Sequence, residues 1–243
     1  MNLSAMSPKA KAAARVPRRS MESEEIYRRI QLAIMERRLV PGAKLVEERL
    51  AEVTGASRTR IRQVFGRLAH EQVVTLIPNR GAFISRPTVE EARELFLARR
   101  LIEPGLAGLL AQQATAAQIQ ILRSHVDQEK KARKDNDLRS IIRLSGEFHI
   151  HIADMVASGI LSRVMRELAS LTCLIITLYD KPNAPACPHH EHGDLVSLIE
   201  AGDSKAAEKY MLEHLQHIEQ ALDLSGEEAD TPDFEAIFGQ DAE

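Results

Sequence analysis

The chain has 243 residues, of which 44% are hydrophobic and 28% charged but only 4% aromatic; this favours a helical globular fold and excludes a wholly disordered chain. No apolar run reaches the roughly 18 residues that span a bilayer, no secretory signal follows the charged N-terminus, and the only cysteines are Cys173 and Cys187, so we expect a cytoplasmic protein. The net charge is −3, but residues 1–87 hold 17 Lys and Arg against 8 Asp and Glu. Either this basic front part binds a polyanion, or solvated charges cluster there by chance.

The front part of the chain has the pattern of three helices followed by a β-hairpin. An isoleucine at every fourth residue marks the first helix, Gly55 suits the left-handed position after the second, and Ser57 is typical of the N-cap of the third. The β-branched segment VVTLI, the turn PNRG and the segment AFIS predict two strands. We expect the helices at residues 22–38, 46–54 and 58–71. This order is the layout of a winged helix-turn-helix.

Three arginines lie at the start of the third helix, in the run SRTRIR that ends at Arg62. A recognition helix meets base edges there, and Arg58 and Arg62 are four residues apart on one face. Either they bind DNA, where an arginine fork takes guanine O6 and N7 together, or they form an exposed helix start without a partner. The helix dipole disfavours cations in a first turn, which favours DNA. With the wing tip included, the predicted DNA contacts are Ser57, Arg58, Thr59, Arg60, Arg62, Arg80 and Gly81.

Only helices are predicted after Pro87. Thr88 and Glu91 form a capping box at the start of the first of them, and Pro104-Gly105 inside it predicts a bend. Further helices are expected at residues 116–134, 137–158, 161–179, 192–201 and 204–222. The fold class is therefore mainly α, a winged helix-turn-helix followed by an all-α bundle. The expected parts are a flexible basic arm at 1–20, a DNA-binding domain at 21–87, an all-helical domain at 88–224 and an acidic mobile tail at 225–243.

The front part closely resembles the winged helix-turn-helix of the GntR family of bacterial transcription regulators. The resemblance rests on the PG before the short helix, the LAE and SRT segments and the NRGAF wing, and it covers about residues 22–87. It implies that Arg58, Arg62 and Gly81 contact operator DNA. Some relatives carry a further DNA-contacting arginine where this chain has Glu48, so that contact is not implied here.

The back half resembles the FCD ligand-binding domain of the FadR branch of the family, over about residues 88–222. The matching segments are ELFLARRLIEP, the Phe148-His149 pair, EHGDLVSLIEAGD and AAEKYMLEHL. Many such domains hold a divalent metal through one Asp and three His on different helices. The resemblance implies that His149, His192 and His214 are the three histidine ligands. Imidazole is the commonest ligand of zinc and related metals, so we expect zinc, with nickel or manganese as alternatives.

Ser145 is a departure from this pattern, because it stands where the family has its acidic ligand, four residues before the first histidine. Serine is a poor ligand, so water or an effector would take that place, or the metal would be lost. Taken singly, each histidine is better explained as a structural residue; taken together, the three favour a metal. Arg99 matches the family's cavity arginine and would either clamp an effector carboxylate or form a salt bridge with Glu103. The histidines that would compensate for Ser145 are His189 and His190, and less well His151 and His217.

The leading interpretation is a homodimeric transcription regulator, most simply a repressor. Its affinity for operator DNA would change when a small organic acid binds in the helical half. A metal-dependent hydrolase is the alternative, because three histidines with an open position also form catalytic zinc sites. The chain has no HExxH pattern and no acidic residue placed as a general base, which disfavours the hydrolase. A structural DNA-bending protein would not need the large acidic helical half.

Overall fold

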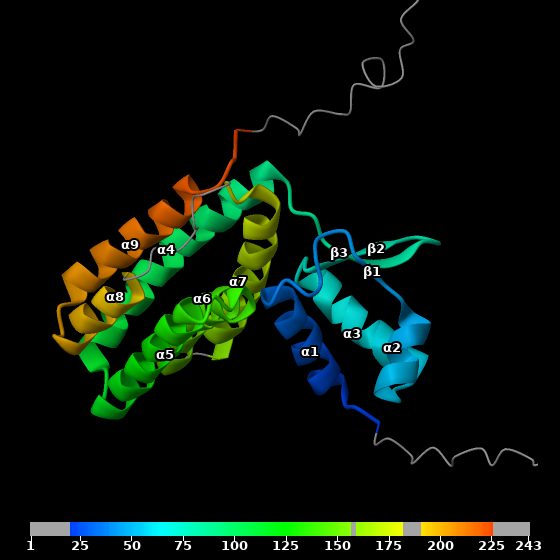
Figure 1. The fold of residues 1–243 in the computed structure, drawn as a ribbon, viewed down its shortest axis with the longest axis horizontal. Coiled ribbons are helices and arrows are strands. Elements are labelled where there is room, and N and C mark those ends of the chain that lie inside the picture. Colours follow the sequence, from blue (N-terminus) through cyan, green and yellow to red (C-terminus); the bar gives the residue numbers. More distant parts are fainter. Residues whose placement is uncertain (1–19, 157–158, 182–190, 226–243) are drawn as a thin grey trace, which may run out of the picture.

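A winged-helix unit forms the front of the chain in the computed structural model, which describes residues 20–156, 159–181 and 191–225 (Figure 1). Its elements are α1 (Ser23–Met35), β1 (Lys44–Leu45), α2 (Glu47–Thr54), α3 (Arg58–His70), β2 (Val74–Ile77) and β3 (Gly81–Ile84). The isoleucine stripe of α1 is buried, and Gly55 has the left-handed φ of 67° after α2. The three predicted helices and the hairpin are confirmed.

The strand β1 is an element that the sequence pattern does not predict. Lys44 and Leu45 pair antiparallel with Phe83 and Ala82 of β3, which gives the sheet order β1-β3-β2. Two residues are too few to show a period of two, and their partners follow about 40 residues later. This strand is therefore defined by its pairing and not by its local sequence.

Helices alone form the described back part. They are α4 (Val89–Gln113), α5 (Ala116–Lys134), α6 (Leu138–Val156), α7 (Gly159–Tyr179), α8 (Glu191–Glu200) and α9 (Ser204–Gln220). The start of α4 and both ends of the other five were predicted to within a few residues. α4 begins at the predicted capping box, where the Thr88 backbone N–H donates to Glu91 at 2.7 Å, and it continues as one helix through Pro104. Residues 85–88 alone separate β3 from α4, and α4 lies beside α9 (Figure 1).

The end of α1 packs against the helical bundle. Met35 shares a buried cluster with Ile150 of α6 and with Ala169 and Cys173 of α7. Just beyond α1, Arg37 forms an ion pair with Asp180 at 3.6 Å. These contacts join the front unit to helices of the bundle.

Some sequence predictions concern parts of the chain that the structure does not describe. Apart from residues 20 and 225, the arm at 1–20 and the tail at 225–243 fall there, as do Cys187, His189 and His190. Within the described ranges, no helix combines the length and apolar character needed to cross a membrane.

Candidate functional site

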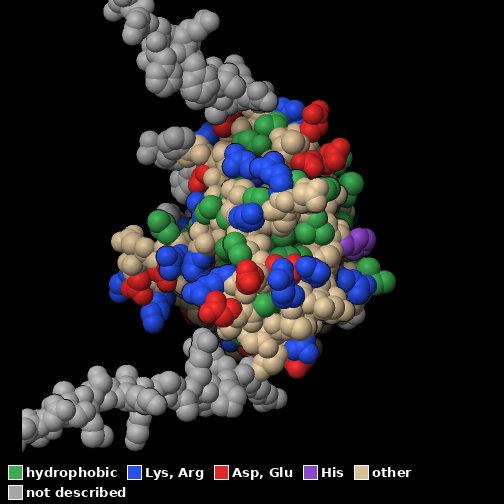
Figure 2. Space-filling model, turned by 90° about the vertical axis from the view of Figure 1, so that its right-hand side faces the viewer, with side chains coloured by type: hydrophobic (Ala, Val, Ile, Leu, Met, Phe, Trp, Pro, Cys, Tyr) green, Lys and Arg blue, Asp and Glu red, His purple; other side chains and the backbone are tan. Residues whose placement is uncertain are grey.

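The predicted recognition helix, α3, begins at the N-cap Ser57, whose Oγ accepts a backbone N–H at 3.2 Å. Arg58 and Arg62 follow on one face, with 60% and 65% of their side chains exposed. Both line a groove between the start of α2, α3 and the wing, together with Asn79 and Gly81 of the wing tip. Lys and Arg side chains gather on this end of the molecule, interspersed with Asp and Glu (Figure 2).

Glu47, at the start of α2, holds both groove arginines. Its Oε1 accepts from Arg58 Nε at 2.6 Å and its Oε2 from Arg62 Nε at 2.7 Å. These two hydrogen bonds lower the pKa of Glu47, so the carboxylate stays ionised. Because each bond uses Nε, the terminal nitrogens of both guanidinium groups are the donors that a base edge would meet. No sequence pattern had pointed to this residue.

The other predicted DNA contacts are not all in the groove. Arg60 does not line it, and its terminal nitrogen donates instead to the backbone oxygen of Met21 at 2.9 Å. Thr59 is exposed on α3, and the guanidinium of Arg80 lies 5.9 Å from an aromatic ring of β3. Gly81 has φ +101°, a conformation that residues with a Cβ rarely adopt, which accounts for a glycine at the wing tip.

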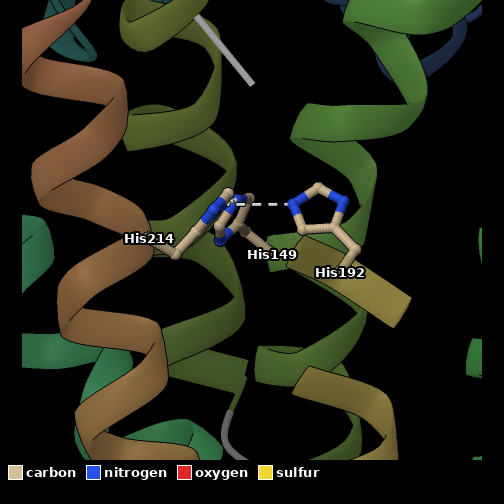
Figure 3. A group of neighbouring side chains, drawn as sticks. All are labelled: His149, His192 and His214. Carbon is tan, nitrogen blue, oxygen red and sulfur yellow. Dashed lines mark hydrogen bonds between the residues drawn. The ribbon is translucent and has the colours of Figure 1, made fainter. Parts of the chain in front are cut away.

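Three buried histidines meet inside the bundle (Figure 3). His149 comes from α6, His192 from α8 and His214 from α9. The Nε2 atom of His214 lies 3.2 Å from that of His192 and 3.4 Å from that of His149, and one ligand atom from each ring lies within 4.8 Å of the others. Nitrogen ligands at about 2.05 Å from a tetrahedral zinc are about 3.3 Å apart, so both short separations fit shared metal coordination.

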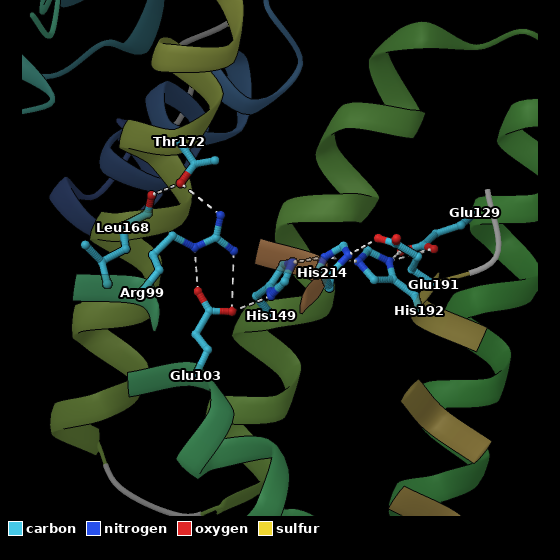
Figure 4. A network of polar contacts seen from close by, with 9 residues as sticks. All are labelled: Arg99, Glu103, Glu129, His149, Leu168, Thr172, Glu191, His192 and His214. Atoms are coloured by element: carbon cyan, nitrogen blue, oxygen red, sulfur yellow. Dashed lines mark hydrogen bonds and ion pairs between the residues drawn. The ribbon is translucent and has the colours of Figure 1, made fainter. Parts of the chain in front are cut away.

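A buried glutamate contacts each of these rings on the side away from the other two (Figure 4). The Nδ1 atoms of His149, His192 and His214 lie 2.5 Å from Glu103, 2.9 Å from Glu129 and 2.5 Å from Glu191, respectively. An Nδ1–H that donates to a carboxylate fixes the tautomer in which Nε2 carries the lone pair. The three Nε2 lone pairs then face a common point, which is the donor arrangement that a divalent cation requires.

Burial keeps the rings of His149 and His214 neutral. It lowers the pKa of His149 to about 4 and that of His214 to about 3, despite the carboxylate beside each ring. A neutral imidazole is the form that binds a metal, so no proton has to leave Nε2 of these rings at pH 7.

The glutamates behind the rings are ionised. Burial by itself would raise the pKa of Glu103, but Arg99 and His149 outweigh it and lower that pKa to about 2. The pKa of Glu129 is also lowered to about 2, because its hydrogen-bonded histidines outweigh burial. These carboxylates supply negative charge close to the triad, which Ser145 does not.

His149 also forms part of the wall of a cavity of about 160 Å³ beside the triad, bordered by α6 and α7. Arg99 and Ser145 line the same cavity, so the structure brings both predicted effector residues together with one predicted metal ligand. Arg99 is buried, and it donates to Glu103 at 2.5 Å and to Thr172 Oγ1 at 3.3 Å. Of the two roles that the sequence offered, the salt bridge with Glu103 is present, and Arg99 also lines the cavity where an effector carboxylate would bind.

The remaining described candidate histidines do not join the triad. The ring of His151 lies 4.9 Å from that of His125, and His217 Nδ1 lies 2.6 Å from Glu191. Within the described ranges, neither belongs to the group of three that would hold an ion. His217 therefore contacts the carboxylate of Glu191, as His214 does, but its ring is not one of the three that meet.

Two family models match the chain. The model for bacterial regulatory proteins of the gntR family matches residues 22–84, and the FCD domain model matches residues 94–217. The HTH-type transcriptional repressor RspR of Escherichia coli is 23% identical over 201 residues, covering 82% of this chain and 88% of RspR. The HTH-type transcriptional regulator LutR of Bacillus subtilis is 26% identical over 206 residues, covering 76% of this chain and 93% of LutR.

Solved structures share this fold over most of the chain. Escherichia coli McbR/YncC superposes with a TM-score of 0.71 at 18% identity, over 82% of this chain and 97% of that one. A putative transcriptional regulator GntR from Rhodococcus sp. RHA1 gives 0.70 at 21% identity, over 85% and 98%. At these identities, the likeness shows a common fold.

Proposed function

The chain belongs to the GntR family of bacterial regulatory proteins and carries an FCD domain, and on that premise we propose that it is a repressor controlled by a metal-bound organic acid. The family and its relatives here are transcription regulators and not enzymes, so this is a DNA-binding transcription regulator, and the hydrolase alternative is withdrawn. Repression is proposed because RspR is named a repressor. Such a protein meets DNA in the cytoplasm, which is its proposed location.

One observation carries the effector part of the proposal: His149 belongs both to the triad and to the cavity wall. The triad of His149, His192 and His214 would hold the ion, zinc in the first place, with nickel or manganese as alternatives. When bound, the ion supplies a Lewis acid that attracts a carboxylate oxygen. Arg99 would clamp the same carboxylate, and the small side chain of Ser145 leaves room for it.

Binding to DNA selected from a random pool tests this function. Zinc-loaded full-length protein selects its preferred sequences, and gel shifts then measure affinity with and without each member of a panel of small organic acids. We expect at least one acid to weaken binding about tenfold, within the usual range of coupling between sites. The same acid should have a smaller effect on metal-free protein. If no acid acts, or if the effect is equal without metal, the proposal is wrong.

The orienting role of Glu47 gives a separate prediction. Glu47→Ala should reduce the discrimination between selected and random DNA by at least about fivefold, because Arg58 and Arg62 lose the carboxylate that fixes them. Affinity for random DNA should rise, since a negative charge leaves the DNA-facing groove. Competition gel shifts measure both. Glu48→Ala removes an equal charge and should keep the discrimination; an unchanged ratio in Glu47→Ala would refute the orienting role.

We also propose that the protein is a homodimer formed through the helical half. A two-fold dimer presents two recognition helices to a two-fold operator. On α4, Leu97, Leu101 and Leu109 expose 51%, 76% and 47% of their surface, and an apolar row of this kind is typical of an interface. The proposed division of the chain gives DNA binding to residues 21–87 and effector binding and dimerisation to residues 88–224.

Leu101→Lys is expected to convert the dimer to monomers at micromolar concentration. Burying one leucine contributes about 1.5–3 kcal/mol and a two-fold interface contains it twice, so the dimer Kd should rise at least about 100-fold. Sedimentation velocity measures this change. Ile160→Lys alters another exposed apolar residue, on α7, and should stay dimeric. A monomeric parent protein, or a dimeric Leu101→Lys, would contradict the proposed interface.

A further inference from the structure

The cavity beside the triad extends away from it along two helices. Its wall follows α6 over residues 138–149, about 16 Å of helix, and follows α7 as far as Asp180. Arg99 and Thr172 are in contact at the end where His149 lies. Asp180, the residue after α7 ends, comes eight residues after Thr172, about 12 Å further along, and marks the opposite end. The cavity therefore has two ends that a single small molecule can touch.

The far end of this cavity belongs to the DNA-binding half. Arg37, just after α1, lines it and approaches Asp180 at 3.6 Å, which is longer than a hydrogen bond. In the described part of the chain, Arg37 Nε is the one buried side-chain nitrogen or oxygen without a hydrogen-bond partner. Its φ of 51° lies in the left-handed region, which residues with a Cβ rarely adopt. The positive φ belongs to the end of α1, where Arg37 N donates to Ile34 O at 2.8 Å, so the observation that points to a ligand is the unpaired buried nitrogen.

The charge and size of the cavity restrict what it can hold. Arg37, Arg99 and Arg133 line it, against Asp180 as the one carboxylate among the described lining residues. Arg99 has the carboxylate of Glu103 beside it at 2.5 Å, whereas Arg37 approaches Asp180 only at 3.6 Å, so the guanidinium of Arg37 is the less closely paired of the two. The volume of about 160 Å³ is close to that of a cavity that holds one benzene molecule, so the ligand has a backbone of about six carbons or fewer.

We propose that Arg37 binds a second carboxylate of the effector, which is therefore a small dicarboxylate held at both ends of the cavity. This inference rests on the proposed function, in which the first carboxylate lies at the His149–Arg99 end. An arginine fork is well suited to a carboxylate. Because Arg37 lies two residues after the end of α1, the ligand joins the bundle to the DNA-binding half and stabilises one position of α1 over others.

Calorimetry with matched acids tests this proposal on the zinc-loaded full chain. The probes are succinate, glutarate and adipate, each paired with the monoacid of equal length: butyrate, pentanoate and hexanoate. We expect at least one diacid to bind the parent protein tenfold or more tightly than its monoacid. In Arg37→Gly that preference should vanish while monoacid binding stays unchanged, and the melting temperature should not fall because glycine suits φ 51°. Arg37→Asn, whose side chain also tolerates this conformation, should behave alike.

Arg38→Gln serves as the matched control, since Arg38 is the next residue and pairs with Glu36 without lining the cavity. It should keep the preference for the diacid. Equal binding of diacids and monoacids by the parent, or a preference that survives in both Arg37 variants, would overturn the role of Arg37 and leave the proposed function standing. A parent protein that binds no acid of either series would overturn the proposed effector site itself, and this inference with it.

Discussion

Replacing His149 and His214 together by alanine will abolish metal binding, whereas the parent protein will hold about one divalent ion per chain when purified without chelator. An ion present at about 1,000 times its Kd adds about 4 kcal/mol to stability, which corresponds to about 8–16 °C in melting temperature for a chain of this size. The measurement is the difference in melting temperature with and without zinc, alongside elemental analysis. That difference should disappear in the double variant.

The zinc-dependent difference is the right quantity because the double variant also leaves Glu103 and Glu191 buried without their histidines. Loss of these partners lowers stability with or without metal, and the subtraction removes that effect. His151→Ala is the control, since this histidine lies outside the triad, and it should retain both the ion and the shift. If the parent protein carries no metal and neither zinc nor nickel changes its melting temperature, the histidines are structural.

Replacing Arg58 and Arg62 together by alanine will weaken binding to selected DNA by at least about 30-fold. Each bidentate base contact is worth about 1–3 kcal/mol, and both arginines lie in one groove with the wing tip. The melting temperature should not change, because both side chains are exposed and make no contact with the core. Gel shifts on the selected DNA and thermal melting measure the two effects.

Arg29→Ala is the matched control for the arginine pair. Arg29 is equally exposed, but it lies on α1 and pairs with Glu25, away from the groove. It should bind selected DNA as the parent does. Affinity of the double variant within about twofold of the parent would show that these arginines do not read the DNA, since even one lost contact exceeds that change.

Local sequence was sufficient to predict the helices of this fold. Thr88 and Ser57 cap helices through side chains that bond backbone groups three residues away, so the signal and its effect lie within one turn. β1 was missed because its two residues acquire an extended conformation from pairing with β3. The sequence predicts a bend at Pro104, which stays a prediction, and the structure shows one helix running through this proline.

The residues of the candidate site could be predicted only in part from the sequence. The resemblance pointed to three histidines, but it gave no sign of Glu129, which lies 63 residues before its partner His192 and comes from another helix. Glu103 was considered only as a partner of Arg99, although it also holds His149. Contacts of this kind depend on how helices pack, so they cannot be predicted from a single glutamate in a helical sequence.

The continuity of α4 has a mechanical consequence. Its 25 residues form a helix about 37 Å long that is joined to the wing strand β3 by four residues and carries Arg99 along its length. Because so short a segment connects β3 to α4, the wing can move little relative to this helix. A tilt of the helix by about 10° moves one end relative to the other by about 6 Å, close to two base steps along a DNA strand. In the proposed function, a ligand that shifts α4 at Arg99 would therefore also shift the wing, and with it the place where the wing meets DNA.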